Sequence, residues 1–297
     1  MPVTQQIERE ASGSKSQFAP GHKIPIQHLT KPGLQSDMGE PKPIYKAAGK
    51  LEGKRAIITG GDSGIGRAVA ILFAMEGASS VIVYLPEEES DAQETKRRVE
   101  QYGQQCHTLA LDIRKKENCQ KIINVTLEKM GRIDILVNNA AFQDMLSDIS
   151  ELDESQWEKT FDTNIHSFFY LSKYALQHMQ KGSTIINCAS VNPYIGRGDL
   201  LDYTSTKGAI VAFTRALSNQ QLKKGIRVNC VCPGPIWTPL IPATMQTEAM
   251  EQFHTVPIGR PGQPSEVATC FVFLASQDSS YISGQCLHPN GGMMVNG

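Results

Sequence analysis

The amino-acid sequence predicts a doubly wound α/β fold, in which one parallel sheet is covered by helices on both faces. The first observation is that, from Lys54 onward, short runs rich in Val and Ile alternate with helical stretches. The second is that these runs are apolar at successive positions, as expected for strands buried on both faces. The third is that the alternation continues without a break, so residues 51–297 are predicted to form one domain.

The order of the elements follows from this alternation. Strands are predicted at residues 56–59, 81–84, 107–111, 133–138, 184–189, 227–231 and 284–287. Helices are predicted at residues 65–76, 88–102, 115–130, 155–180, 200–222 and 265–275. Because helices connect successive strands, we expect the strands to be parallel, with right-handed crossovers.

Residues 1–50 differ from the rest of the chain. They hold six of the sixteen prolines and show neither the period of a strand nor that of a helix. Such a segment builds no core of its own. It is either a disordered tail or an extended arm that lies on the body or on a neighbouring subunit. The apolar residues at 24–26, at Leu29 and at 43–45 favour the arm.

Composition excludes several classes of function. The formal net charge of −1 argues against nucleic acid as a main partner, because proteins that bind it carry a basic patch. No apolar run is long enough to cross a membrane, and the polar N-terminus lacks a secretory signal. The seven cysteines are an odd number, and Cys230-Val231-Cys232 lacks the C-x-x-C spacing of a metal or redox pair. We therefore expect a cytoplasmic protein with reduced cysteines and no metal.

A glycine-rich turn joins the first predicted strand to the first predicted helix, with the sequence Thr59-Gly60-Gly61-Asp62-Ser63-Gly64-Ile65-Gly66. Glycines let the backbone turn tightly, and the amides at a helix N-terminus suit an anionic pyrophosphate. The alternative is an ordinary tight turn. Because the first strand–turn–helix is the context of a dinucleotide site, we expect Gly60, Asp62, Ser63, Ile65 and Gly66 to contact a dinucleotide.

Charge indicates which dinucleotide binds. The adenosine ribose is expected at the end of the second predicted strand, near Tyr84 and Leu85. NADP needs an Arg or Lys for its additional phosphate, and neither type lies here or in the glycine-rich turn. Glu87, Glu88 and Glu89 follow instead. The sequence therefore favours NAD, with NADP possible.

Tyr203 and Lys207 lie four residues apart in the predicted helix 200–222. Residues at this spacing share a helix face, so the ammonium is expected to lower the pKa of the phenol from its usual value of about 10. A phenol tuned in this way can exchange a proton with a substrate oxygen. The alternative is an exposed pair on a solvated helix.

Further motifs occur in order along residues 51–297: Asp112-Ile113, Asn138-Asn139-Ala140, Asn164, Ser190 and Pro233-Gly234-Pro235-Ile236-Trp237-Thr238. With the glycine-rich turn and the Tyr203–Lys207 pair, they resemble the short-chain dehydrogenase/reductase superfamily, which has a Rossmann domain. The proline-rich arm and the acidic run after Tyr84 also resemble a bacterial subgroup of stress-associated oxidoreductases.

The resemblance implies catalytic roles for four residues. Tyr203 would be the acid/base, and Lys207 would lower its pKa and bind the nicotinamide ribose. Ser190 would hydrogen-bond the substrate oxygen where charge develops. Asn164 would kink its helix and hold a water that relays protons to Lys207.

The resemblance also implies contacts with the cofactor. Asp112 and Ile113 would meet the adenine, with Asp112 accepting a hydrogen bond from its exocyclic amine. Asn139 and Ala140 would line the adenosine ribose, and Pro233, Gly234, Ile236 and Thr238 would border the nicotinamide. One position departs from the family pattern, since Ala141 stands where the family usually has glycine.

The implied reaction is reversible hydride transfer between the nicotinamide and a small or medium alcohol or carbonyl compound. Gln143, residues 191–194 and a mobile lid at residues 237–255 would form the substrate pocket. The spacing of Tyr203 and Lys207 argues against the enoyl-reductase branch. A sugar 1-dehydrogenase of the same fold is the alternative, and a non-catalytic dinucleotide-binding protein is a further one. Because members of the family form dimers or tetramers, a homotetramer is expected.

Overall fold

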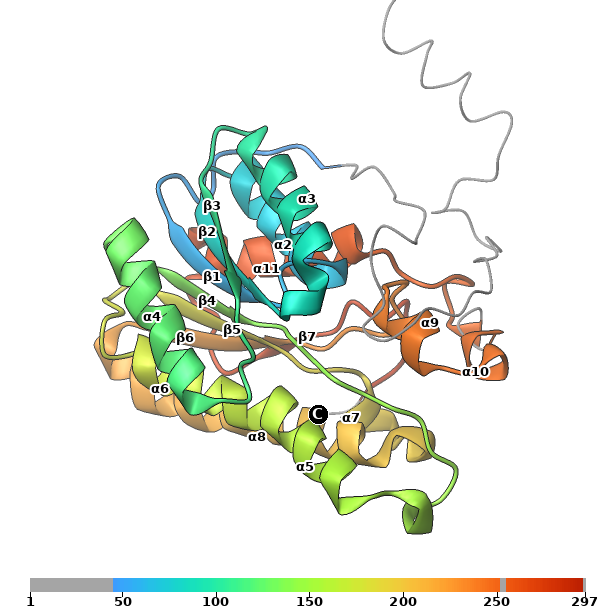
Figure 1. Ribbon diagram of the computed structural model, residues 1–297. Helices are drawn as coiled ribbons and strands as arrows, with labels where there is room; N and C mark the ends of the chain where they lie inside the picture. The colour runs from blue at the N-terminus through green and yellow to red at the C-terminus, as the bar shows by residue number, and fades with distance from the viewer. Residues whose placement is uncertain (1–44, 252–254, 296–297) are drawn as a thin grey trace, which may run out of the picture.

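The computed structural model describes residues 45–251 and 255–295. The predictions made for residues 24–26, Leu29 and residues 43–44 fall outside this range. Within it, the predicted doubly wound α/β fold is confirmed as a single domain-like unit built on one parallel sheet (Figure 1).

Seven strands in the described residues form this sheet, in the order β3-β2-β1-β4-β5-β6-β7, and all neighbours are parallel. They are β1 (Arg55–Thr59), β2 (Ser79–Tyr84), β3 (Cys106–Ala110), β4 (Ile135–Asn138), β5 (Thr184–Cys188), β6 (Arg227–Val231) and β7 (Cys286–Leu287). The chain builds outward from β1 to β3 and then returns to β4 on the other side of β1. Ligands of open α/β sheets bind at the carboxyl ends of the strands beside such a reversal.

Helices cover both faces of the sheet (Figure 1). One face carries α2 (Gly64–Met75), α3 (Glu89–Glu100) and α11 (Pro264–Ala275). The other face carries α4 (Lys116–Met130), α5 (Glu154–Phe161), α6 (Ser167–Ala175) and α8 (Leu201–Gln221). Three short helices, α7 (Asn192–Ile195), α9 (Leu240–Thr244) and α10 (Thr247–Glu251), lie beyond one end of the strands.

The central strands are buried on both faces, as the sequence predicted. Ile57 and Ile58 are adjacent in β1 and both fully buried, yet Ile57 packs into the core with α4 and α6, and Ile58 into the core with α2 and α11. This division follows because successive side chains of a strand point to opposite faces. Ile185 and Ile186 in β5 divide in the same way. Each buried isoleucine stabilises the fold by roughly 2 kcal/mol relative to exposure.

The predicted helix 155–180 is interrupted and ends early. After α5, residues Asp162–His166 form a π-helical turn, and α6 ends at Ala175. Inside the turn, the side chain of Asn164 accepts a hydrogen bond from the Phe142 amide at 2.7 Å and donates one to the Phe142 carbonyl at 2.9 Å. Such π-turns are frequent at functional sites and bend a helix. The expected distortion at Asn164 is therefore present, while the predicted helix end at residue 180 was wrong.

Other predicted boundaries differ from the structure by one or two residues, and two of these differences have a local cause. The last strand, predicted at residues 284–287, contains only Cys286 and Leu287, because Gly284 has a φ of +74° in the left-handed region. The second helix begins at Glu89, after a 3-10 turn over Pro86–Glu88 that the proline starts. The three short helices after β5 and β6 were not predicted, since each is too brief to show a helical period.

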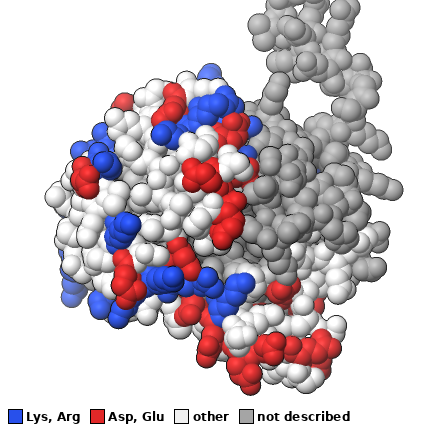
Figure 2. All heavy atoms as spheres, in the orientation of Figure 1, with Lys and Arg blue, Asp and Glu red and all other residues white. Residues whose placement is uncertain are grey.

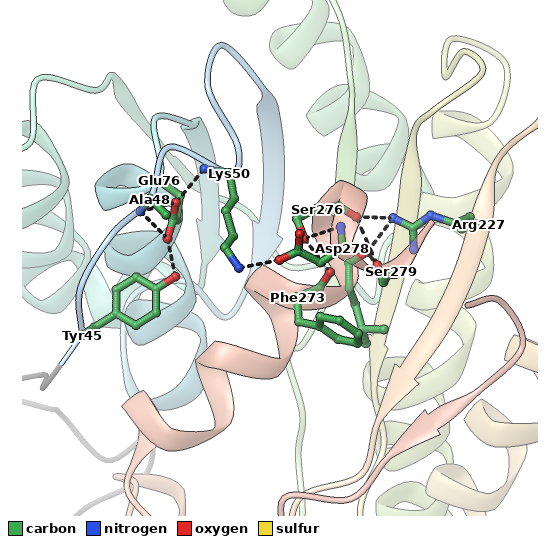
Figure 3. Close-up of polar contacts among 10 residues, drawn as sticks. Tyr45, Ala48, Lys50, Glu76, Arg227, Phe273, Ser276, Asp278 and Ser279 are labelled. Carbon is green, nitrogen blue, oxygen red and sulfur yellow. Dashed lines mark hydrogen bonds and ion pairs between the residues drawn. The ribbon is translucent and has the colours of Figure 1, made fainter. Parts of the chain in front are cut away.

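The first described residues are tied to the domain by one buried carboxylate (Figure 3). Glu76 at the end of α2 accepts hydrogen bonds from the Tyr45 hydroxyl and from the amides of Ala48 and Lys50, at 3.1 and 2.7 Å for the two amides. The Lys50 ammonium pairs with Asp278, which follows α11. Burial raises the pKa of Glu76, but these hydrogen bonds outweigh it and hold the pKa below its usual value. Glu76 is therefore an anion, and its hydrogen bonds hold residues 45–50 against the domain.

The surface in view in Figure 2 carries acidic and basic side chains interspersed, in keeping with the net charge of −1. Among the described residues, no helix combines the length and apolar character needed to cross a membrane.

Candidate active site

A cavity of about 970 Å³ lies over the carboxyl ends of the strands, near the upper end of the ordinary range of ligand pockets. Of the residues predicted to contact cofactor or substrate, its walls contain Gly60, Asp62, Ser63, Ile65, Tyr84, Leu85, Asp112, Ile113, Asn139, Ala140, Ser190, Tyr203, Lys207, Pro233, Gly234, Ile236 and Thr238. Two residues predicted to bind the cofactor or to take part in catalysis, Gly66 and Asn164, do not line the cavity. Residues from seven separate segments of the chain thus share one space.

The glycine-rich turn after β1 is packed too closely for larger residues. Gly60 has a φ of +61°, and a Cβ added at Gly66 would lie only 1.8 Å from the carbonyl oxygen of Gly60. Asn139 donates hydrogen bonds from its side chain to the carbonyls of Thr59 and Gly60, at 3.0 and 3.2 Å. Ser63 occupies the N-cap of α2 without a side-chain capping hydrogen bond. The turn therefore fits a dinucleotide pyrophosphate, because small residues and a helix N-terminus face the cavity.

Carboxylates gather where the adenosine ribose is expected. Burial raises the pKa of Asp62 to about 6, and burial together with the nearby Asp62 raises the pKa of Glu88 to about 8. Glu88 also accepts a hydrogen bond from the Leu85 amide at 2.8 Å. The buried guanidinium of Arg67 lies beneath this group and pairs with Asp91 at 3.0 Å. Arg67 does not line the cavity, so the exposed wall here is acidic.

Asp112 is engaged by an arginine that sequence reasoning overlooked. Arg114 grips both oxygens of its carboxylate, with the closest contact at 2.7 Å from Nη2 to Oδ2. This pairing holds the pKa of Asp112 below its usual value. Arg114 also lines the cavity, so one cation lies where the adenine is expected. The signal was its position two residues after Asp112, where an Asx-type turn folds the side chain back.

Ser190, Tyr203 and Lys207 lie together on the cavity wall. Ser190 follows β5, and its hydroxyl accepts a hydrogen bond from the Asn192 amide at 3.2 Å. The ammonium of Lys207 is almost fully buried, donates to the Cys188 carbonyl at 2.9 Å, and lies 5.1 Å from the centre of the Tyr203 ring. The sequence alternative of an exposed pair on a solvated helix is therefore wrong.

The predicted lowering of the Tyr203 pKa is not found in the protein by itself. Burial of the phenol dominates and raises its pKa, whereas a hydrogen bond from Ser190 acts in the opposite direction. Lys207 does not offset this burial, because its ammonium points to the Cys188 carbonyl and is itself desolvated, which lowers its own pKa. The phenol is thus held in its protonated form at neutral pH.

Asn164 supports α8 from behind. Besides its two bonds to Phe142, its side-chain amide donates to the Thr206 hydroxyl at 3.0 Å, and this hydroxyl donates to the Tyr203 carbonyl at 2.7 Å. Asn164 is fully buried and does not itself line the cavity, although Phe142 does. The side chain therefore connects the π-turn, the segment after β4 and α8.

The substrate end of the cavity differs in part from the prediction. Gln143 and residues of the predicted lid line it, and the Gln143 amide donates to the Thr244 hydroxyl of α9 at 2.9 Å. Tyr194 does not line it, because its hydroxyl lies 3.9 Å from the sulfur of Cys232 instead. Two cations were missed: Lys159, which lies over the Phe142 ring at 3.9 Å, and Arg197, paired with Asp199. Ala141 requires no positive φ, so the departure from the family pattern costs no strain.

A parallel doubly wound sheet, a glycine-rich turn after β1 and a single cavity that joins this turn to Ser190, Tyr203 and Lys207 define a dinucleotide-dependent oxidoreductase. A family described as "Enoyl-(Acyl carrier protein) reductase" matches residues 60–294. The chain belongs to the short-chain dehydrogenase/reductase family, as the motifs indicated.

Three relatives share about half of their residues with this chain. General stress protein 39 of Bacillus subtilis is 51% identical over 280 residues, which cover 92% of this chain and 97% of the relative. The Daucus carota protein named glucose and ribitol dehydrogenase is 50% identical over 277 residues, covering 91% and 94%. NADPH-dependent aldehyde reductase 1, chloroplastic, of Arabidopsis thaliana is 52% identical over 259 residues, covering 85% and 90%. The first of these agrees with the predicted resemblance to stress-associated oxidoreductases.

Solved structures share the fold. A short-chain dehydrogenase from Burkholderia cenocepacia J2315 in complex with NADP superposes with a TM-score of 0.77 at 28% identity, covering 82% of this chain and 98% of that one. A 3-ketoacyl-(acyl-carrier-protein) reductase from Brucella melitensis complexed with NADH has a TM-score of 0.75 at 29% identity, covering 82% and 98%. Proteins of this fold are thus found with either dinucleotide.

Proposed function

We propose that this protein interconverts a small alcohol and its carbonyl compound with a nicotinamide dinucleotide, preferring NAD, and that Tyr203 is the acid/base. The observation that carries the proposal is the presence of Ser190, Tyr203 and Lys207 on the wall of the same cavity as the glycine-rich turn. The bound nicotinamide would supply or accept the hydride. The protein would supply position and charge.

Each of the three side chains has a distinct task in this proposal. A buried, protonated phenol is the form of Tyr203 that donates a proton to a carbonyl oxygen during reduction. Ser190 would hold the same oxygen and stabilise its developing charge. Lys207, with its ammonium fixed on the Cys188 carbonyl at 2.9 Å, would hold a ribose hydroxyl and favour the phenolate during alcohol oxidation.

The preference for NAD rests on the acidic wall at the adenosine end. Asp62, Glu87 and Glu88 line it, and the additional phosphate of NADP would meet the negative charge of those carboxyl groups that are ionised, with Glu88 mainly ionised above a pH of about 8. Arg114 is a cation that lines the cavity where the adenine is expected, and its guanidinium is already hydrogen-bonded to the carboxylate of Asp112. NADP is the alternative, which the name of the Arabidopsis thaliana relative favours.

The substrate class follows from the pocket and from the relatives. The lid contributes Leu240, Ile241 and Met245, and Gln143 and Arg197 also line the pocket, so the pocket suits a compact molecule with both apolar and hydroxyl groups. Relatives are named for aldehyde reduction and for glucose and ribitol oxidation. We propose short aldehydes and polyols or aldoses as the first substrates to test. An enoyl thioester serves as the contrasting substrate, because the matched family description names it.

The decisive experiment removes the hydroxyl oxygen of Tyr203. Tyr203→Phe should lower kcat by at least about 10³-fold on every accepted substrate while the dissociation constant for NAD changes by less than about threefold. Tyr174→Phe, at a half-buried tyrosine on α6 outside the cavity, is the matched control and should retain full turnover. Near-normal turnover in the Tyr203 variant would remove the proposed acid/base, and turnover on the enoyl thioester alone would replace the proposed reaction.

We further propose that the protein is a cytoplasmic homotetramer. All seven cysteines are free thiols, in keeping with a reducing compartment. Light scattering on the full chain would give the subunit number, and a mass other than that of four chains would overturn this part of the proposal.

A further inference from the structure

Cys286 meets Cys230 and Cys232, which are distant from it in sequence, behind the cavity wall. Cys230 lies in β6 and Cys232 directly follows this strand, two residues further on, so their side chains fall on the same face. Cys286 lies on β7, directly opposite Cys230 in the strand register. The three sulfur atoms all lie within 4.8 Å of one another, and those of Cys230 and Cys232 are 3.7 Å apart.

These distances are compatible with sulfur ligands that share one metal ion. A tetrahedral zinc ion with Zn–S bonds of about 2.3 Å holds its sulfur ligands roughly 3.8 Å apart. The sulfur atoms of Cys230 and Cys232 already have about this separation. Cys286 has to approach by no more than about 1 Å, which a change in its side-chain torsion supplies without movement of the strand.

Positive charge lies close to the cluster. The Lys207 ammonium interacts electrostatically with Cys230 and Cys232. A thiolate is the form of cysteine that binds metals, and a nearby cation favours a charged sulfur over a neutral one.

A fourth position faces Tyr194 and His288. The Tyr194 hydroxyl lies 3.9 Å from the sulfur of Cys232, and its ring packs edge-on against that of His288 with centroids 4.9 Å apart. His288 follows Cys286 by two residues, and its Nδ1 is buried without a hydrogen-bond partner. Cys286 is partly exposed, which gives an ion a route to the buried pair.

We propose that Cys230, Cys232 and Cys286 form a binding site for one thiol-seeking d¹⁰ metal ion, Zn²⁺ or Cu⁺, with the fourth position open toward Tyr194 and His288. Binding would replace the protons of the thiols, which pass to solvent, with no change of oxidation state. The ion would join β6 to β7 immediately before Pro233 and Gly234 in the cavity wall. The site is separate from the hydride-transfer chemistry, and the sequence expectation of no metal did not foresee it, because Cys286 is brought in by the sheet.

The test uses the full chain, reduced and then freed of reductant and metal under anaerobic conditions. Co²⁺ and Cd²⁺ serve as spectroscopic probes, since thiolate coordination gives near-ultraviolet charge-transfer bands. We expect saturation at about one ion per chain, displacement by Zn²⁺, and a separate Cu⁺ arm in competition with a colorimetric chelator to decide between the two ions. At a hundredfold excess over its Kd, Zn²⁺ should raise Tm by about 5 °C.

Cysteine variants test which residues bind the metal. Cys232→Ala and Cys286→Ala should each abolish the bands and the rise in Tm, whereas Cys270→Ala, at a half-buried thiol on α11, should keep both. Alkylation of Cys286 in the unmodified chain, slowed at least tenfold by Zn²⁺, tests the same site if a variant fails to fold. Bands that survive in the Cys286 variant overturn the proposal. So does an isolated protein whose Cys286 is already in a disulfide with Cys230 or Cys232, since that would make the cluster a redox pair.

Discussion

Gly66 offers the sharpest test of how the glycine-rich turn is built. In Gly66→Ala the new Cβ would lie 1.8 Å from the carbonyl oxygen of Gly60, 2.7 Å from its carbonyl carbon and 2.8 Å from the side-chain nitrogen of Asn139. Carbon and carbonyl oxygen come no closer than about 3.3 Å even in favourable contacts. The turn must therefore shift by roughly 1.5 Å, and the obstacle is backbone, which rotation of a side chain cannot relieve.

The energy follows from two opposing effects. Alanine improves helix propensity by about 1 kcal/mol over glycine inside a helix. Overpacking of this kind costs typically about 1–3 kcal/mol and more where backbone has to move. We expect a net loss near 2 kcal/mol, or about 4–6 °C in Tm for a domain of this size. The displaced turn should also weaken NAD binding by about tenfold or more, because the same amides face the cavity.

Gly208 in α8 is the matched control. A Cβ there meets nothing closer than the Cβ of Pro193 at 3.8 Å, so Gly208→Ala should gain the helix propensity without the clash and raise Tm slightly. Thermal denaturation and calorimetric titration with NAD measure both effects. If Gly66→Ala matches Gly208→Ala in stability and binds NAD normally, the account of the turn is wrong.

Three further predictions follow from the site and its supports. Protonation of Glu88, whose pKa is raised to about 8, should lessen its repulsion of the NADP phosphate. The ratio of kcat/KM for NADP to kcat/KM for NAD should therefore rise roughly fivefold from pH 9 to pH 7, and it should not change with pH in Glu88→Gln. Asn164→Ala should destabilise the fold by about 2–3 kcal/mol and raise KM, since Phe142 loses two hydrogen bonds; an unchanged urea midpoint would contradict this. Glu76→Gln should speed hydrogen exchange at residues 45–50 without changing kcat, and equal protection would show that other contacts hold this segment.

The sheet could be predicted from sequence because its signal is local. Apolar runs such as 56–59 are buried on both faces, and this shows in consecutive residues without knowledge of their neighbours. The glycine-rich turn was also predictable, because strand, turn and helix follow one another directly. Helix ends were less predictable, since the π-turn at Asn164 depends on the backbone of Phe142, a residue outside the helix.

Features that depend on distant partners escaped sequence reasoning. The sign of the Tyr203 pKa shift depends on burial, which outweighs an ammonium directed at another group. The cysteine cluster requires that β6 and β7 pair in one particular register, which places Cys286 opposite Cys230. Spacing along the chain contains neither fact. The prediction was therefore sound about the strands and most of the longer helices, and limited about the short helices and the chemistry that contacts between elements create.

The π-turn at Asp162–His166 joins α5 to α6 and sets how α6 is rotated about the helix axis relative to α5. One additional residue per turn rotates everything after it by about 100° relative to an uninterrupted α-helix. That rotation lets α5 present one side to α8 while α6 presents a different side to α4. A deletion of one residue within this turn would make α5 and α6 one straight helix, but it would also turn α6 away from α4. The length of this segment is therefore constrained even where its side chains are exposed.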